Sequence, residues 1–276
     1  LPSRAPPPAF LPPPPVWTWT GFYIGLNAGY TFGGSNSVDV ETAPGVAIAG
    51  AQPVANALAA SATDVLSLDN SGFIGGGQVG YNLQFANSWL VGIETDIQGT
   101  GARNSASAIV TVPIAVVPPT TTQAQSNISV NNAVDYLGTV RGRLGFLVTP
   151  ALLIYGDGGF AYGGVHEGVD IAATLPPIGL GASPAFGGFS NTRTGWTAGG
   201  GLEWMVSPNW SVKAEYLYYE LGRVTFGVGG LTTTISGTTI FTDPATASTR
   251  FNGHIVRVGL NYQFNWWNPG PVVAKY

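Results

Sequence analysis

Residues 195–222 read GWTAGGGLEWMVSPNWSVKAEYLYYELG, and their spacing decides the fold. Apolar or small residues fill every second position over 196–204 and again over 210–218, separated only by Ser207-Pro208-Asn209. The alternate positions include polar side chains such as Glu203 and Lys213. A period of two is typical of a strand with one apolar face, and a three-residue gap is typical of a tight turn. The stretch therefore predicts two antiparallel strands of about ten residues each.

The same alternation recurs in eight segments along the chain. The expected strands cover residues 21–30, 73–85, 89–98, 134–146, 152–162, 193–204, 210–219 and 254–264. Their connections alternate between short turns, at 86–88, 148–150 and 207–209, and four long loops, at 31–72, 99–133, 163–192 and 220–252. Short turns at one end and long loops at the other are typical of a transmembrane β-barrel, whose short turns face the periplasm.

Composition favours a membrane rather than water as the surrounding solvent. Only 9% of the 276 residues are charged and 45% are hydrophobic, whereas ordinary domains have about 25% charged residues. This excludes a disordered chain, and the net charge of −4 argues against a nucleic-acid partner. A spanning helix needs about 20 mostly apolar residues, but the charge-free stretches 42–63 and 104–134 are interrupted by prolines and polar residues.

A closed barrel is the other structure that pairs every backbone polar group inside a bilayer. We therefore predict an all-β fold, an eight-stranded antiparallel up-and-down transmembrane β-barrel with short periplasmic turns and four long extracellular loops. The barrel covers residues 21–264, between a proline-rich segment at 1–20 and a tail at 265–276. An even number of strands places both chain ends on the periplasmic side.

The proline-rich segment cannot pair as a strand, because proline has no N–H to donate. Its run from Pro6 to Pro15 predicts an extended polyproline conformation. We expect residues 1–15 to act as a plain tether or, alternatively, to contact a periplasmic or cell-wall partner.

Tryptophans gather near the predicted short turns and the chain ends. The seven are Trp17, Trp19, Trp89, Trp204, Trp210, Trp266 and Trp267. Because indoles favour the membrane interface, these residues predict an aromatic girdle at the periplasmic rim.

The strand face opposite the lipid-facing residues carries six acids and five bases. They are Glu94, Asp96, Asp135, Asp157, Glu203 and Glu215, with Arg141, Arg143, Arg193, Lys213 and Arg257. The interior of an eight-stranded barrel is just wide enough for side chains to fill it, and buried ions must be paired. We therefore predict a charge network that closes the lumen, with a charged small-solute porin as the alternative.

An enzyme is the competing class of function. The chain has two histidines and no cysteine, so we expect no metal site and no cofactor. His166, beside Glu167, lies at a predicted loop root, and His254 lies at the loop end of the last strand. No nucleophile motif accompanies them, which makes an outer-membrane lipid-modifying enzyme the least favoured alternative.

Six segments resemble a known family. They are WTGFYIGLNAGY (19–30), GFIGGGQVGYNLQF (72–85), WLVGIETDIQG (89–99), YLGTVRGRLGFLVTPALLIYGDGGFAYG (136–163), the opening stretch at 195–222, and HIVRVGLNYQF (254–264). They are similar to the small porin-like surface proteins of alphaproteobacteria, which are related to the OmpA transmembrane barrel. The resemblance skips the long loops. It implies an integral protein of a Gram-negative outer membrane, surrounded by lipid and lipopolysaccharide.

The end of the last strand resembles an assembly signal. Gly259, Tyr262 and Phe264 are similar to the pattern by which the assembly machinery of this family reads the last strand. The tail at 265–276 also ends in an aromatic residue, so either end could be the one that is read.

The long loops hold few charges for a solvated surface. SASAIVTVPIAVV (105–117) and LTTTISGTTIF (231–241) alternate and are rich in β-branched residues, which predicts hairpins beyond the membrane. Residues 53–62 predict a short helix with proline in its first turn. Apolar surfaces of this kind are typical of contact sites. We expect a structural or surface-interaction role in which the loops mediate self-assembly, as an oligomer or array, or partner contacts; a lid over the barrel is the alternative.

Overall fold

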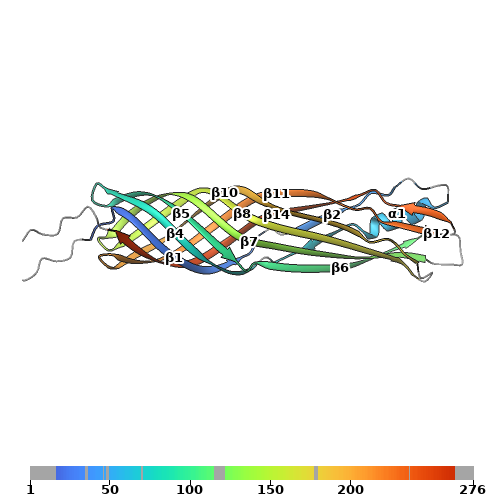
Figure 1. Cartoon of the computed structure of the whole chain (residues 1–276), viewed down its shortest axis with the longest axis horizontal. Helices are drawn as coiled ribbons and strands as arrows, with labels where there is room; N and C mark the ends of the chain where they lie inside the picture. Colours follow the sequence, from blue (N-terminus) through green and yellow to red (C-terminus); the bar gives the residue numbers. More distant parts are fainter. Residues whose placement is uncertain are drawn as a thin grey trace, which may run out of the picture.

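Eight long strands pair antiparallel in a closed ring. The computed structural model describes residues 17–34, 37–45, 47, 50–69, 71–114, 122–176, 180–235 and 237–264. The ring consists of β1 (Gly21–Phe32), β4 (Gly72–Phe85), β5 (Trp89–Thr100), β7 (Thr122–Thr149), β8 (Leu152–Leu175), β10 (Ala185–Ser207), β11 (Trp210–Val228) and β14 (Ala245–Phe264). The ladder between β1 and β14 closes it, from Phe22 opposite Phe264 to Phe32 opposite His254. The predicted eight-stranded barrel is confirmed, and Figure 1 shows it as one long tube.

An apolar belt covers the outside of the barrel next to the short turns. Its exposed side chains include Leu26 on β1, Ile93 on β5 and Val140 on β7. They are exposed because successive residues of a strand point to opposite faces of the sheet. The apolar residues at every second position therefore lie on the outer face of the barrel. A strand of about 9–11 residues crosses a bilayer, so this belt is the surface that fits lipid. Among the described residues, no helix is long and apolar enough to cross a membrane.

Five strands continue past the apolar belt and build a second tier. β7, β8, β10, β11 and β14 are 19 to 28 residues long, about twice the length that a crossing needs. In this tier, three other strands take the places of β1, β4 and β5. β2 (Ser37–Glu41) pairs with β14, β3 (Asp64–Ser67) pairs with β2, and β6 (Arg103–Ile114) pairs with β7. Much of the loop sequence is therefore barrel wall (Figure 1).

The hairpins predicted from the loop sequences are confirmed. β6 forms a ladder with β7, and β12 (Thr232–Ile235) pairs with β13 (Thr238–Phe241). The third loop is shorter than predicted, because β8 runs on to Leu175. It pairs with β10 as far as Ile171 and with β9 (Leu180–Gly181) at Thr174 and Leu175. Small residues continue the alternation of inward and outward side chains across the predicted third loop. Strands β8 and β10 therefore both stay in the sheet there.

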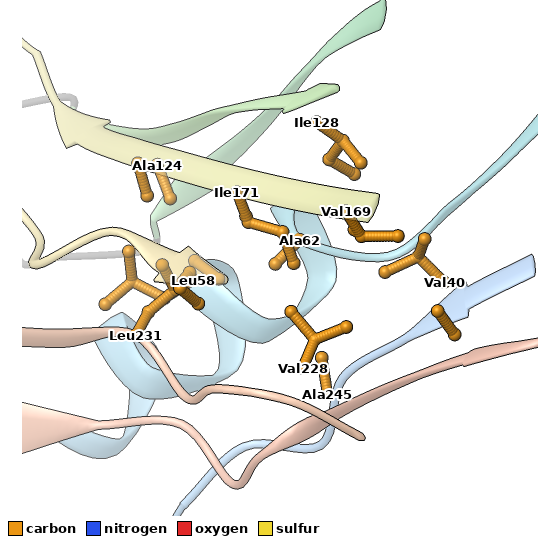
Figure 2. Close-up of a cluster of buried hydrophobic side chains, with 14 of the residues drawn as sticks. Val40, Leu58, Ala62, Ala124, Ile128, Val169, Ile171, Val228, Leu231 and Ala245 are labelled. Atoms are coloured by element: carbon orange, nitrogen blue, oxygen red, sulfur yellow. The ribbon is translucent and has the colours of Figure 1, made fainter. Parts of the chain in front are cut away.

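One helix lies inside the loop end of the tube. Helix α1 (Gln52–Ser61) has its proline in the first turn, as predicted. Its buried Leu58, together with Ala62 just after the helix, belongs to an apolar cluster that includes Ile171 of β8 and Val228 of β11. Figure 2 shows these side chains converging from the helix and the surrounding strands. The second tier therefore has an apolar interior, as a water-soluble barrel does.

The belt predicts a depth-dependent penalty for charge. We expect Val140→Arg, in the middle of the belt on β7, to lower the free energy of unfolding by about 2–4 kcal/mol. Phe186→Arg is the matched control, because Phe186 is 64% exposed on the second tier. Urea titration in lipid vesicles measures both, and an equal loss in the two variants would contradict the assignment of the belt to lipid.

Candidate functional site

The strand registers place acids opposite bases inside the belt tier. The facing pairs are Glu94 and Arg141, Arg143 and Asp157, Glu203 and Lys213, and Glu215 and Arg257. Residues directly opposite on one sheet face are close neighbours. The ladders alone therefore bring opposite charges together.

Arg141 lies at the centre of this network. Its guanidinium is 2.9 Å from a carboxylate oxygen of Asp96 and 3.1 Å from one of Glu215, and it also bonds Glu94 and Asp157. All five side chains are fully buried. The planar guanidinium presents five N–H groups in a fixed fork, which suits it to several carboxylates at once.

Lys213 and Arg257 connect the same acids from the other side of the lumen. Lys213 Nζ lies 2.8 and 3.0 Å from the two carboxylate oxygens of Glu94. Arg257 lies 2.8 Å from Asp96 and 2.5 Å from Glu215. Glu94, Asp96 and Glu215 therefore each bind more than one base, so the removal of one base changes the surroundings of several acids.

Two tyrosines complete the network and were missed as site residues. Arg143 bonds Glu203 at 2.7 Å and the hydroxyl of Tyr23 at 2.9 Å, and its guanidinium stacks 3.9 Å from the ring centroid of Tyr155. The Tyr23 hydroxyl in turn donates to Glu94 at 2.6 Å. Both tyrosines fall on the polar face of their strands, which is the signal that could have identified them.

A chain of amide side chains extends the network across the lumen. Asn261 donates to Glu203 at 2.7 Å, Gln78 donates to Asn261 at 2.5 Å, and Asn27 donates to Gln78 at 3.0 Å. Ser211 also donates to Glu203, at 2.6 Å. These bonds reach from β14 and β11 to β4 and β1, so the polar groups join across the whole ring.

The structure brings nine of the predicted lumen charges together. They are Glu94, Asp96, Asp157, Glu203 and Glu215, with Arg141, Arg143, Lys213 and Arg257. Asp135 is a wrong prediction. A β-bulge between Val134 and Tyr136 shifts the register, and Asp135 contacts Arg103 and His166 on the outer wall instead.

The prediction that Arg193 belongs to the network, which came from the period-two alternation, is also wrong. It lies opposite Gly163, whereas Asp157 lies opposite Gly199, six residues further along β10. Its guanidinium donates to the backbone carbonyl of Arg223 at 3.0 Å. The residue faces the correct side of its strand but sits too far toward the loops to meet the buried acids.

The predicted girdle divides into two groups. Trp89, Trp204 and Trp210 are exposed at the turn end of the belt. Trp19 is 1% exposed and belongs inside the barrel, so its assignment to the girdle is wrong. Trp17 is half-buried and packs against the same cluster, and its place in the girdle stays a prediction. Trp266 and Trp267 lie outside the described residues.

Trp19 closes the turn end because the segment before β1 folds back into the barrel mouth. Its indole donates to the carbonyl of Pro150 at 3.0 Å, and its own carbonyl accepts from Gln263 at 3.0 Å. It packs with Leu90, Leu153 and other apolar residues in one cluster.

The side chains that fill the lumen form four successive levels along β8, and these levels differ in polarity. Leu153 belongs to the Trp19 cluster, and Asp157 belongs to the charge network. Val165 lies in a second apolar cluster with Leu221 and Phe251, and Ile171 lies in the cluster around α1. Each level is formed by buried side chains from several strands.

A second aromatic rim marks the loop end of the belt. Trp196 packs against Tyr218, and Tyr30 packs edge to face on Phe73. His254 stacks on the ring of Tyr216, whose hydroxyl lies 2.6 Å from its Nδ1 atom. His254 is therefore part of this rim.

The two residues of the His166-Glu167 pair point to opposite faces of β8. Glu167 is buried in the second tier, and burial raises the pKa of its carboxyl to about 8. His166 faces outward, 2.6 Å from Asp135. Within the described part of the chain, no group of three or more histidine or acidic side chains is arranged to hold a metal ion.

The residues of the expected assembly signal lie on the last strand near the turn end. Tyr262 packs edge to face on both Phe264 and Trp210, at 5.1 Å between ring centroids. Gly259 faces the lumen, where an added Cβ atom would lie 2.9 Å from Lys213. Packing in the lumen thus favours a glycine here, and the role in assembly stays a prediction.

The comparisons with known proteins agree with this geometry. The family described as outer membrane protein beta-barrel domain matches residues 8–264. The chain belongs to this family. This outer-membrane barrel is 33% identical, over 91% of its length and 86% of the relative's, to the 31 kDa outer-membrane immunogenic protein of Brucella melitensis. It is 26% identical to the 22 kDa outer membrane protein of Rhizobium leguminosarum, over 76% of this chain and 67% of that one.

Two solved outer-membrane proteins align with most of this chain at low sequence identity. OprG from Pseudomonas aeruginosa is 12% identical, with 90% of this chain and 98% of that chain covered and a TM-score of 0.45. Ail from Yersinia pestis is 14% identical, with 86% and 99% covered and a TM-score of 0.29.

The network predicts a large cost for the loss of its central base. We expect Arg141→Met in this outer-membrane barrel to lower the free energy of unfolding by about 3–5 kcal/mol, because several buried acids lose a partner. Arg223→Met is the control, since Arg223 is exposed and 3.7 Å from Asp39, and it should cost less than about 1 kcal/mol. Urea titration compares the two, and similar small losses would show that the buried acids do not depend on Arg141.

Proposed function

We propose that the protein is a closed outer-membrane barrel that works at the cell surface, where its extracellular tier makes contacts with copies of itself. The observation that carries this proposal is the succession of buried layers in the lumen, from Trp19 to helix α1. A small-solute porin needs a continuous water-filled path, and an eight-stranded barrel is at the lower limit of width for one. The buried network and the three apolar clusters leave the porin alternative without support from this geometry.

The barrel pattern supports an orientation. The three short turns, Trp17 at the start of the described chain and Phe264 at its end all lie at one end of the tube. Short turns face the periplasm in outer-membrane barrels, so we place both chain ends there and the second tier outside the cell. The suggested contact of residues 1–15 with a periplasmic or cell-wall partner falls outside the described residues.

Strand β6 supports a contact role for the second tier. One edge of β6 pairs with β7, and among the described residues no strand pairs with its other edge. From 104 to 114 the strand carries no charge, and Ile109 is 68% exposed. An uncharged free edge is a template for pairing with another chain, and proteins that avoid such pairing place charges or prolines there. Pro113 lies near the end of the strand, so this proline interrupts only that part of the edge, and β3 lies close to β6 without pairing with it.

Electrical recording tests whether the lumen is closed. We expect the purified full-length chain to give no stable ohmic conductance in a planar bilayer, because buried side chains fill each layer of the lumen that the structure describes. The wild-type chain refolded under the same conditions must first show the heat-dependent gel shift of a folded barrel. A large, steady conductance from that sample would contradict a closed lumen and favour the small-solute porin.

Cross-linking in native membranes tests the β6 edge. We expect wild-type protein to give oligomers that Ile109→Lys abolishes, because a lysine beside a free edge opposes pairing with another strand. Phe186→Lys is the control, since it adds the same charge at an exposed site on β10, where Phe186 lies opposite Asp170 of β8 and its carbonyl accepts from the N–H of Gly229. Oligomers that persist in Ile109→Lys would show that the contact lies elsewhere on the protein. Monomer in every sample would contradict the self-assembly proposal.

A further inference from the structure

A polar groove crosses the outer wall just beyond the apolar belt. It has a volume of about 760 Å³ and spans β6, β7, β8 and β10. Its lining includes Arg103, Ser105, Asn131, His166, Gly168 and Ser190. Neither the lumen nor the free edge of β6 uses these side chains.

The bulged residue Asp135 organises the charged end of this groove. One carboxylate oxygen lies 3.3 Å from Arg103 Nη2, and the other lies 2.6 Å from His166 Nε2. The Arg103 side chain is still 73% exposed. Because a guanidinium has five N–H groups, most of those of Arg103 remain available to an anionic ligand.

Two tyrosines place the groove at the membrane boundary. On the outer wall, the ring of Tyr136 covers Gly164 and the ring of Tyr162 covers Gly138, so closely that an added Cβ atom would lie 2.5 and 2.3 Å from them. Tyrosine rings of this kind mark the level of lipid headgroups. Asp135 immediately precedes Tyr136, so the groove begins where headgroups of the outer leaflet lie.

A shallow apolar groove lies on the membrane side of the same wall. It has a volume of about 320 Å³, and Gly77, Val79, Thr95, Ile97 and Tyr162 line it from the outer face. Gln78 and Asp96 also border it, but their side chains bond within the lumen. Ile97 pairs with Gly138, the glycine that Tyr162 covers, so this groove reaches the tyrosine boundary from below. A polar site above an apolar one fits a ligand with a polar head and an acyl chain.

We propose that these two grooves bind a glycolipid of the surrounding outer leaflet through its phosphorylated sugar headgroup. Arg103 binds the phosphate, Ser105, Asn131 and Ser190 bind sugar hydroxyls, and an acyl chain occupies the lower groove. The polar groove spans four strands, and three inter-strand steps of about 4.8 Å give a width of about 14 Å. That width suits a sugar-sized headgroup better than the single phosphate of a phospholipid. The inference rests on the outer-membrane location and is independent of lumen closure and self-assembly.

Binding of lipid A, a phosphorylated and acylated glucosamine disaccharide, tests the site. We expect the full-length protein in detergent micelles to bind lipid A more tightly than phosphatidylglycerol, as measured by native mass spectrometry across a lipid titration. Arg103→Gln should weaken lipid A binding about five- to twentyfold, because it removes a charge-assisted hydrogen bond. Arg223→Gln, which neutralises another exposed arginine, should leave binding unchanged.

A filled groove provides a second test that keeps all charges. Nothing lies within 4 Å of the position of a Cβ atom on Gly168, so Gly168→Leu should fold and block the groove. Gly227→Leu is its control, because Gly227 on β11 is equally open. Folding of every variant is checked by the heat-dependent gel shift. Equal lipid A binding by Gly168→Leu and Gly227→Leu, or equal binding of the two lipids by the wild-type protein, would overturn the proposal.

Discussion

A bilayer offers no partner to a backbone N–H or C=O group, and the rest of this structure depends on how the chain meets that constraint. The ladder between β1 and β14 removes both free edges from the belt tier. Eight strands closed in this way leave an interior only as wide as its own side chains. The charge network, the buried tyrosines and the Trp19 layer are consequences of that width, because each polar group inside has mainly other side chains to bind.

The polarity of the barrel inverts along single strands. In the belt tier, β8 turns Asp157 inward and Phe160 outward, whereas in the second tier it turns Val169 inward and Asp170 outward. The period of two is unchanged, but the solvent outside changes from lipid to water. The same backbone thus supports a polar lumen at one end and an apolar core around α1 at the other.

The two tiers also differ in how strictly they must close. Water can satisfy the backbone of the second tier, so this tier tolerates a free edge on β6, which the belt tier could not. Membership of the outer-membrane family accounts for the belt and the ring. The features that distinguish the extracellular end, namely the β6 edge and the groove beside Asp135, lie in segments that the family resemblance of the sequence skipped.

Local patterns in the sequence determined the strand number, the turn positions, helix α1 and nine of the lumen charges, because strand periodicity and turn chemistry are properties of neighbouring residues. The outward turn of Asp135 depended on a bulge, which adds one residue to a strand and leaves no trace in composition. Arg193 depended on strand stagger, and Trp19 on a fold-back of the segment before β1. Only the tertiary structure decided these, since register, stagger and fold-back are set by contacts between residues far apart in the chain.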